Sequence, residues 1–189
     1  PVFFDREKLR YQGPLSERCF ALFSSLGFRK LLADYAPTTA IVEKDYEVVR
    51  TESDLRTLVD AINNAGQLSL ATLTDRQPPM QAELVGLSLS VGPGHARYIP
   101  LAHRALDTAS VLSSTVVSAL IAKPLANKQI EKIGHDLKHS SLVLGRHNLP
   151  VEGITIDTLV VSYLLDVTGT HQLGGLALEY LGYNAIPLE

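Results

Sequence analysis

The sequence contains no tryptophan, one methionine and one cysteine, Cys19, among its 189 residues. A single cysteine excludes an internal disulfide and is typical of a reducing compartment, so we expect a cytoplasmic protein. The longest apolar runs, at 84–91 and 158–165, are far shorter than the roughly 20 residues that span a bilayer. No signal-peptide pattern opens the chain. These absences exclude the secreted disulfide-rich class and predict a protein without a membrane span.

An excess of positive charge is also lacking. The net charge is −3, which does not suit a protein whose whole surface attracts nucleic acid. The hydrophobic content of 46% and the charged content of 20% are those of a globular protein with a substantial core. Because the sequence opens with Pro1 and not with methionine, we expect it to be a piece of a longer polypeptide.

Local patterns divide the chain into three segments. Residues 1–37 are expected to form a short helical connector, because Pro14 and Ser16 provide a helix start and an apolar stripe follows at helical spacing. Residues 38–47 are the expected linker, rich in proline and threonine at its start. The remaining segment, 48–189, is long enough for the main domain.

Strand and helix patterns alternate along the main domain. Strands are predicted at 46–49, 68–73, 84–91, 97–100, 129–133 and 153–156. Helices are predicted at 51–62, 108–121, 137–147, 159–165 and 173–181. The close spacing of the second to fourth strands favours an antiparallel meander, and the later segments alternate between helix and strand. The pattern predicts an α/β fold in which helices flank a mixed sheet.

Several segments, taken in order, resemble the 3′–5′ exonuclease domain of family A DNA polymerases, the DNA polymerase I type. They are 68–75, 83–88, 98–103, 134–140, 156–159 and 176–182. The resemblance implies a ribonuclease-H-like, DnaQ-type exonuclease fold over 48–189. It makes Leu9–Leu32 similar to the segment that joins an upstream 5′-nuclease region. It also implies a monomeric part of a bacterial DNA polymerase I, whose polymerase region would use Mg²⁺ and DNA in replication and repair.

The resemblance locates the positions of the family's metal ligands. In the family, a strand carries Asp-x-Glu and a helix carries an Asp; the matching residues here are Ala71, Leu73 and Ser140. Two-metal hydrolysis requires hard oxygen ligands, which carboxylates provide. None of these three side chains has a carboxylate. We therefore expect no catalytic residue, no metal bound by this segment, and a structural role, with Ala71 and Leu73 packed in a core. The family's third motif would lie beyond Glu189.

One alternative is a displaced carboxylate site that keeps the exonuclease active. Asp75 shares strand parity with Ala71 if the strand continues, and Asp136 precedes Ser140 by one helical turn. Asp157 follows a strand and would complete the set. Each of the three acids also suits a turn or a helix N-cap.

A second alternative is a zinc site. His135 and His139 have the i, i+4 spacing of zinc ligands on a helix, and His147 or His171 would supply a third ligand. Against this site, the glycine before His135 indicates that the helix only begins there. In addition, Asp136 is one methylene shorter than the glutamate that such a zinc site uses as its general base.

Basic residues concentrate between positions 123 and 146. Lys123, Lys128, Lys132, Lys138 and Arg146 outnumber Glu131 and Asp136 and give a local net charge of +3. In the family, the helix of this motif faces the single-stranded substrate, so the resemblance makes Lys138, His135 and His139 candidates for weak, salt-dependent DNA contacts, with a solvated helix face as the alternative. A further alternative is a protein-interaction module formed by Leu9–Tyr35.

Overall fold

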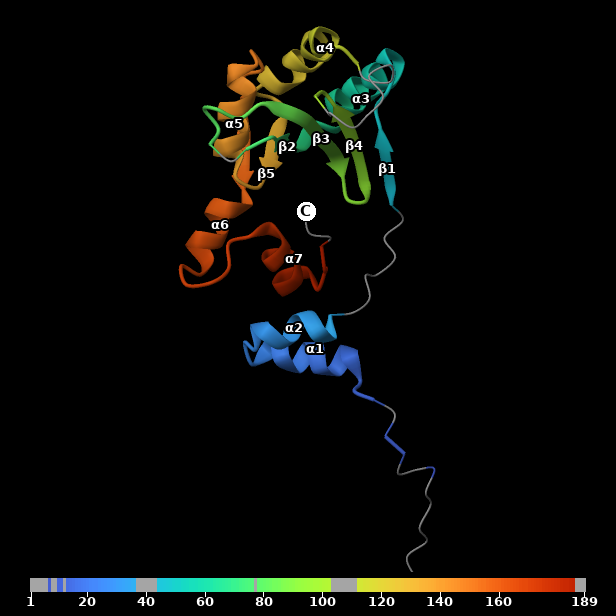
Figure 1. The fold of residues 1–189 in the computed structure, drawn as a ribbon, viewed down its shortest axis with the longest axis vertical. Helices are drawn as coiled ribbons and strands as arrows, with labels where there is room; N and C mark the ends of the chain where they lie inside the picture. The colour runs from blue at the N-terminus through green and yellow to red at the C-terminus, as the bar shows by residue number, and fades with distance from the viewer. Residues whose placement is uncertain are drawn as a thin grey trace, which may run out of the picture. The chain divides into compact units, whose positions relative to one another are not determined.

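The computed structural model describes residues 7, 10–11, 13–36, 44–76, 78–102 and 112–185. The chain divides into two compact units (Figure 1). The larger unit contains Ile41–His171, and the smaller one combines Pro1–Ala40 with Gln172–Glu189.

The larger unit is built on a six-stranded sheet with the order β1-β4-β3-β2-β5-β6. The strands are β1 (Asp45–Val48), β2 (Gln67–Thr74), β3 (Leu84–Gly92), β4 (His95–Pro100), β5 (Glu131–Gly134) and β6 (Ile154–Asp157). β2, β3 and β4 form an antiparallel meander. β1 pairs with β4, and β5 pairs with β2 and β6, in parallel. The mixed sheet and the meander that the sequence predicts are both confirmed.

The described helices of this unit are α3 (Glu52–Ala65), α4 (Ser114–Ala126), α5 (Leu137–Arg146) and α6 (Thr158–Leu165). α3 begins as predicted because Thr51 and Asp54 form a capping box, in which each side chain accepts a hydrogen bond from the other residue's N–H at 3.1 and 3.2 Å. α4 ends well past the predicted position 121, because Pro124 is accommodated inside the helix. The predicted start of this helix, at 108–111, lies outside the described residues. None of the described helices is long and apolar enough to cross a membrane.

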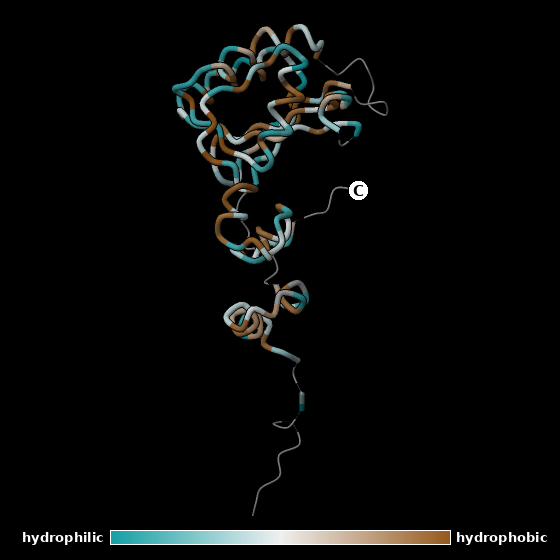
Figure 2. Tube along the Cα trace, turned by 90° about the vertical axis from the view of Figure 1, so that its left-hand side faces the viewer, coloured by the Kyte–Doolittle hydropathy of each residue, from teal (hydrophilic) through white to brown (hydrophobic). Residues whose placement is uncertain are grey.

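The core lies on one face of the sheet. Leu68 and Leu70 of β2 point into it, with Leu87 and Leu89 of β3 and Ile99 of β4, and all five are buried. The helices contribute further buried side chains: Leu55, Leu58 and Ile62 of α3, Val117, Ile121 and Leu125 of α4, and Leu137, Val143 and Leu144 of α5. Along the chain of this unit, hydrophobic and hydrophilic residues interleave (Figure 2), as a sheet with one buried face requires.

The other face of the sheet carries small and aromatic side chains. We call it the open face, and define it by Tyr46, Val48, Ser69, Ala71, Leu73, Gly86, Ser88, Ala96 and Tyr98, which the strand register places side by side. Apart from Gly86, these residues are exposed or half-buried. The open face therefore includes two of the positions that the sequence singles out, Ala71 and Leu73.

The smaller unit consists of α1 (Ser16–Ser25), α2 (Arg29–Tyr35) and α7 (Leu173–Leu181). Its aromatic residues cluster, with the Phe23 ring centroid 6.1 Å from that of Phe28 and 5.2 Å from that of Tyr35. Leu32 of α2 is also buried. By packing, α7 belongs with α1 and α2, whereas the boundaries predicted from local sequence patterns end the connector at 37 and place α7 in the main domain. Those functional boundaries stay a prediction.

Candidate functional site

The positions matched to the family's Asp-x-Glu lie on β2 at its carboxyl end. Ala71 is exposed and Leu73 is half-buried, both on the open face. The expectation that they pack in a core is therefore wrong. The reason is strand parity, because Leu68 and Leu70 fill the core and residues of odd number on β2 point the other way. A register shift between Leu73 and Thr74 then ends the regular pairing with β3.

Ser140 lies in the first turn of α5 and is buried. Its Oγ lies 3.2 Å from Oγ1 of Thr72, the strand residue between Ala71 and Leu73. The structure thus brings all three matched positions to one end of β2, with Ser140 against the intervening residue. A neutral hydroxyl pair joins helix and strand there, and none of the three matched side chains carries an anionic oxygen.

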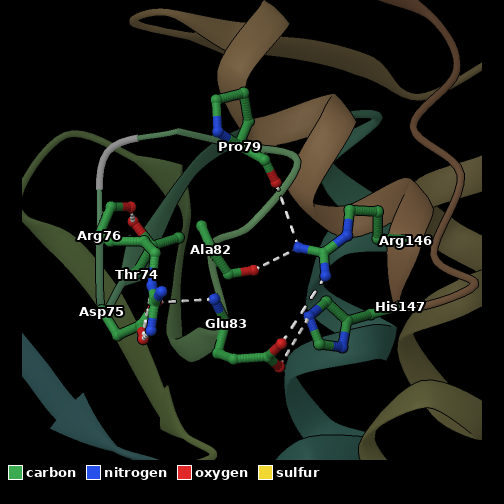
Figure 3. A network of polar contacts seen from close by, with 8 residues as sticks. All are labelled: Thr74, Asp75, Arg76, Pro79, Ala82, Glu83, Arg146 and His147. Carbon is green, nitrogen blue, oxygen red and sulfur yellow. Dashed lines mark hydrogen bonds and ion pairs between the residues drawn. The ribbon is translucent and has the colours of Figure 1, made fainter.

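Asp75, the first acid of the displaced site, closes the connection between β2 and β3 (Figure 3). One carboxylate oxygen accepts a hydrogen bond from the Glu83 N–H at 2.8 Å, and the other lies 2.8 Å from a guanidinium nitrogen of Arg76. The bond from Arg76 and that from the Glu83 N–H hold the pKa of the Asp75 carboxyl below its ordinary value. Asp75 is therefore a loop-closing residue in this structure.

Asp157, at the end of β6, joins the starts of two helices. Its Oδ1 accepts from the N–H of Asp136 at 3.0 Å and that of Leu159 at 2.9 Å, and its Oδ2 accepts from the N–H of Leu137 at 2.8 Å. Asp136 is the N-cap of α5, in the left-handed conformation with φ 53°, and accepts from the His139 N–H. Both acids thus have the capping roles that the sequence offers as their alternative. Among the described residues, no group of three or more His, Cys, Asp or Glu side chains could hold a metal ion.

His135 and His139 do not form the predicted pair of zinc ligands on one helix, because α5 begins at Leu137. His135 precedes the N-cap, so it does not share a helical face with His139. Its Nδ1 lies 3.0 Å from Oγ1 of Thr158, whose hydroxyl donates to the Gly134 carbonyl at 3.1 Å. Because that hydroxyl has one proton, Nδ1 of His135 is the donor in this pair. His171 instead contacts Ser162 Oγ through its Nδ1 at 2.9 Å.

Arg146 has a role that no sequence pattern indicates. The basic cluster predicts a solvent-facing cation, but its guanidinium donates to the carbonyls of Pro79 and Ala82 and lies 3.7 Å from the Glu83 carboxylate (Figure 3). His147 approaches the same carboxylate at 3.9 Å. α5 therefore holds the β2–β3 connection through Arg146 and the end of β2 through Ser140.

Lys132, also counted in the basic cluster, is buried. Its ammonium donates to the carbonyl oxygens of Asn127 and Ile130, and burial lowers the pKa of the Lys132 side chain from its ordinary value of 10.5. The reason is register, because Lys132 pairs with the buried Leu68 and so points to the core face. The exposed basic surface is accordingly smaller than the sequence predicts, although Lys138 remains exposed.

Because of Lys132, the free energy of unfolding of the protein should increase as the pH is raised into the alkaline range. The unfolded chain, with the ordinary lysine pKa, binds more protons than the native chain, so the free energy of unfolding rises as pH approaches 10.5. Replacement of Lys132 by methionine removes this contribution. Urea denaturation from pH 7 to 10 should show the difference between the two proteins growing in favour of the lysine. The exposed Lys128→Met variant is the control, and an equal slope for both variants would contradict the prediction.

The family of 3′–5′ exonucleases matches residues 46–187 of the chain. Similar curated proteins are DNA polymerase I of Pseudomonas aeruginosa, 30% identical over 198 residues, and DNA polymerase I of Synechocystis, 29% identical over 140 residues. The first alignment covers 97% of this chain and 22% of the relative, the second 71% and 14%. The chain thus spans about a fifth or less of these relatives.

Solved structures show the same fold. Trypanosoma brucei RNase D is similar with a TM-score of 0.60 and 16% identity, over 79% of this chain and 52% of that one. Brucella melitensis NrnC has a TM-score of 0.56 and 15% identity, over 79% and 65%. The polymerase domain of Pol1 from M. smegmatis has a TM-score of 0.59 and 20% identity, over 73% and 23%. With its ribonuclease-H-like fold and a family match over three quarters of its length, the chain belongs to the 3′–5′ exonuclease family related to the DNA polymerase I exonuclease domain.

Proposed function

We propose that this chain is a proofreading-exonuclease domain that has lost its chemistry and has a structural role in a DNA polymerase I. The observation that carries the proposal is the joint loss of carboxylates at Ala71, Leu73 and Ser140, two on the open face and one against Thr72. Mg²⁺ and Mn²⁺ require oxygen ligands of high charge density, which a methyl group, an isobutyl group and a hydroxyl do not replace. Nucleotide transfer, with its Mg²⁺, would belong to the polymerase region of the parent chain.

The displaced site is not supported as an alternative. The carboxylates of Asp75, Asp136 and Asp157 accept hydrogen bonds from backbone N–H groups that close a loop or begin a helix. A metal ion would compete with those hydrogen bonds. DNA remains the proposed partner, through weak contacts by Lys138, His135 and His139 beside the start of α5 and through the parent polymerase.

A metal titration with a degradation assay tests the proposal. The unaltered chain should show no saturable Mn²⁺ or Mg²⁺ binding by calorimetry and no metal-dependent release of nucleotides from a single-stranded 3′ end. A saturable isotherm with product release would overturn it. In that case Asp75→Asn and Asp136→Asn would identify whether displaced acids hold the metal.

A second candidate function is protein interaction by α1 and α2. Leu22, Leu26 and Phe28 are exposed, each with more than half of its surface accessible. Exposed apolar side chains grouped on neighbouring helices are typical of an interaction surface. A separately expressed polymerase region should bind the chain, and Leu22→Lys with Phe28→Lys should weaken that binding at least about tenfold. Equal affinity of the double variant and the unaltered chain would exclude this role.

A further inference from the structure

β1 is the outermost strand on one side of the sheet, and apolar packing holds it less than the strands beside it (Figure 1). It pairs in parallel with β4 over four residues, from Asp45 to Val48. No side chain of β1 is buried, whereas β2, β3 and β4 all contribute to the core. Buried apolar contact begins only at Val49, directly after the strand. Packing alone therefore attaches β1 weakly.

A cavity of about 610 Å³ lies between β1 and α3. Asp45 and Glu47 of β1 line it, with Leu89 and Arg97 of the neighbouring strands and Leu58 of α3. Its other charged lining residues are Arg50, Asp54 and His95. Because α3 does not fill this space, few van der Waals contacts fix β1 from that side.

Arg97 of β4 holds β1 by polar contacts instead. Its Nη1 donates to the backbone carbonyl of Asp45 at 2.8 Å, and its Nη2 donates to Oδ2 of the same residue at 2.8 Å. Its Nε lies 3.4 Å from the Glu47 carboxylate. His95 adds a fourth contact, with Nδ1 3.1 Å from Oδ2 of Asp45. Two side chains of β4 thus hold the backbone and both acids of β1.

These contacts form a network, whereas an isolated surface ion pair would contribute little. Only 27% of the Arg97 side chain is accessible, which limits screening of its charge by water. Hydrogen bonds from Arg97, and then from His95, hold the pKa of the Asp45 carboxyl below its ordinary value of 3.8, so the acid is ionised at neutral pH. Glu47 and His95 are exposed, with 68% and 60% of their side chains accessible, so salt should weaken the network.

We propose that β1 is a releasable strap, which an ionic latch of Arg97 and His95 on Asp45 and Glu47 holds to β4. The chain passes between its two units before Ile41 and after His171, and β1 is the first strand after the earlier passage. Release of its four residues would lengthen this connection by about 13 Å, at 3.3 Å per extended residue, while the rest of the sheet stays folded. The strap goes beyond the proposed function and does not depend on it.

Amide hydrogen exchange of the whole chain, measured by mass spectrometry on peptides that cover 44–50, tests the strap. The N–H groups of Asp45 and Val49 report on the pairing, because they donate to the carbonyls of Gly94 and Tyr98 at 2.8 Å. Arg97→Met should speed exchange in these peptides at least about tenfold, because it removes several hydrogen bonds of a charged group. In the unaltered chain, raising NaCl from about 0.02 M to about 0.5 M should also speed it, and the variant should not respond to salt.

The matched control is Arg56→Met, because Arg56 also pairs with a carboxylate, that of Glu52, but on α3. It should leave exchange at 44–50 unchanged. Asp45→Asn removes the charge that the latch holds and keeps the shape of the side chain, so it should speed exchange as Arg97→Met does. Exchange at 44–50 that is the same in the unaltered chain and in both latch variants would overturn the proposal. Equal acceleration in β2 and β3 would also overturn it, because the whole sheet would then have lost stability.

Discussion

A triple variant with Ala71→Asp, Leu73→Glu and Ser140→Asp should bind Mn²⁺ saturably and release nucleotides from a single-stranded 3′ end. We expect the rate to exceed that of the unaltered chain at least about 100-fold, because removal of even one preorganised charge-stabilising group from an active site costs about that much. Two carboxylates on the open face of β2 would share the ions with one at the start of α5. Calorimetric titration and a gel-based degradation assay measure the two effects.

The solvent exposure of the open face makes this experiment practicable. Ala71 is exposed and Leu73 half-buried, so acids at these two positions remain hydrated in the absence of metal, whereas Ser140 is buried and an acid there is the costly one of the three substitutions. Metal binding should then stabilise the triple variant, by about 2.7 kcal/mol at a free Mn²⁺ concentration of 100 times Kd. The unaltered chain should show no such rise in melting temperature.

The double variant Ala71→Asp with Leu73→Glu is the matched control. Because Ser140 lies on α5 and the other two positions lie on β2, the double variant separates the strand positions from the helix position. If the third carboxylate is a ligand, the triple variant binds Mn²⁺ more tightly than the double variant. Equal affinities would show that an acid at position 140 is not a metal ligand. No binding by either variant would contradict the assignment of all three positions.

The elements that the sequence predicts well are those with complete local signals. The capping box of Thr51 and Asp54 determines the start of α3, and alternating apolar residues determine β2 and β3. The alternation in β2 also indicates which face of the sheet carries Ala71. Ala71 lies on the same face of the strand as the polar residue Ser69, whereas Leu68 and Leu70 lie on the opposite face and are buried in the core. The expectation of a buried Ala71 followed the family's site and not the pattern of the strand itself.

The residues that the sequence could not place depend on distant partners. Lys132 is buried because β5 pairs with β2, and a short strand alone does not specify which of its faces meets the core. Arg146 donates hydrogen bonds to backbone carbonyl oxygens 64 and 67 residues away along the chain. Every residue has a backbone carbonyl, so a sequence does not indicate which one a side chain will bind. Composition counts both side chains as surface charge. Only tertiary structure shows that one is a core residue and the other holds a loop.

Replacement of Asp157 by alanine should lower the free energy of unfolding by about 2–4 kcal/mol, since the loss of a helix N-cap alone costs about 1 kcal/mol and hydrogen bonds to a charged group contribute more. Its carboxylate accepts from three N–H groups, those of Asp136, Leu137 and Leu159, at the starts of α5 and α6. Leu137 is buried, so its N–H would lose its partner away from water. Urea denaturation at neutral pH measures the loss.

Asp157→Asn distinguishes this capping role from a metal role. Asparagine keeps one acceptor oxygen, so it should retain part of the stability that alanine loses, whereas for a metal ligand the two substitutions would both abolish binding. Equal destabilisation by both variants would show that the negative charge at the two helix N-termini matters more than the acceptor geometry. Stability unchanged in the alanine variant would contradict the capping role. In the expected case, an acid that would otherwise count toward a displaced exonuclease site is shown to hold α5, and with it Ser140, against the sheet.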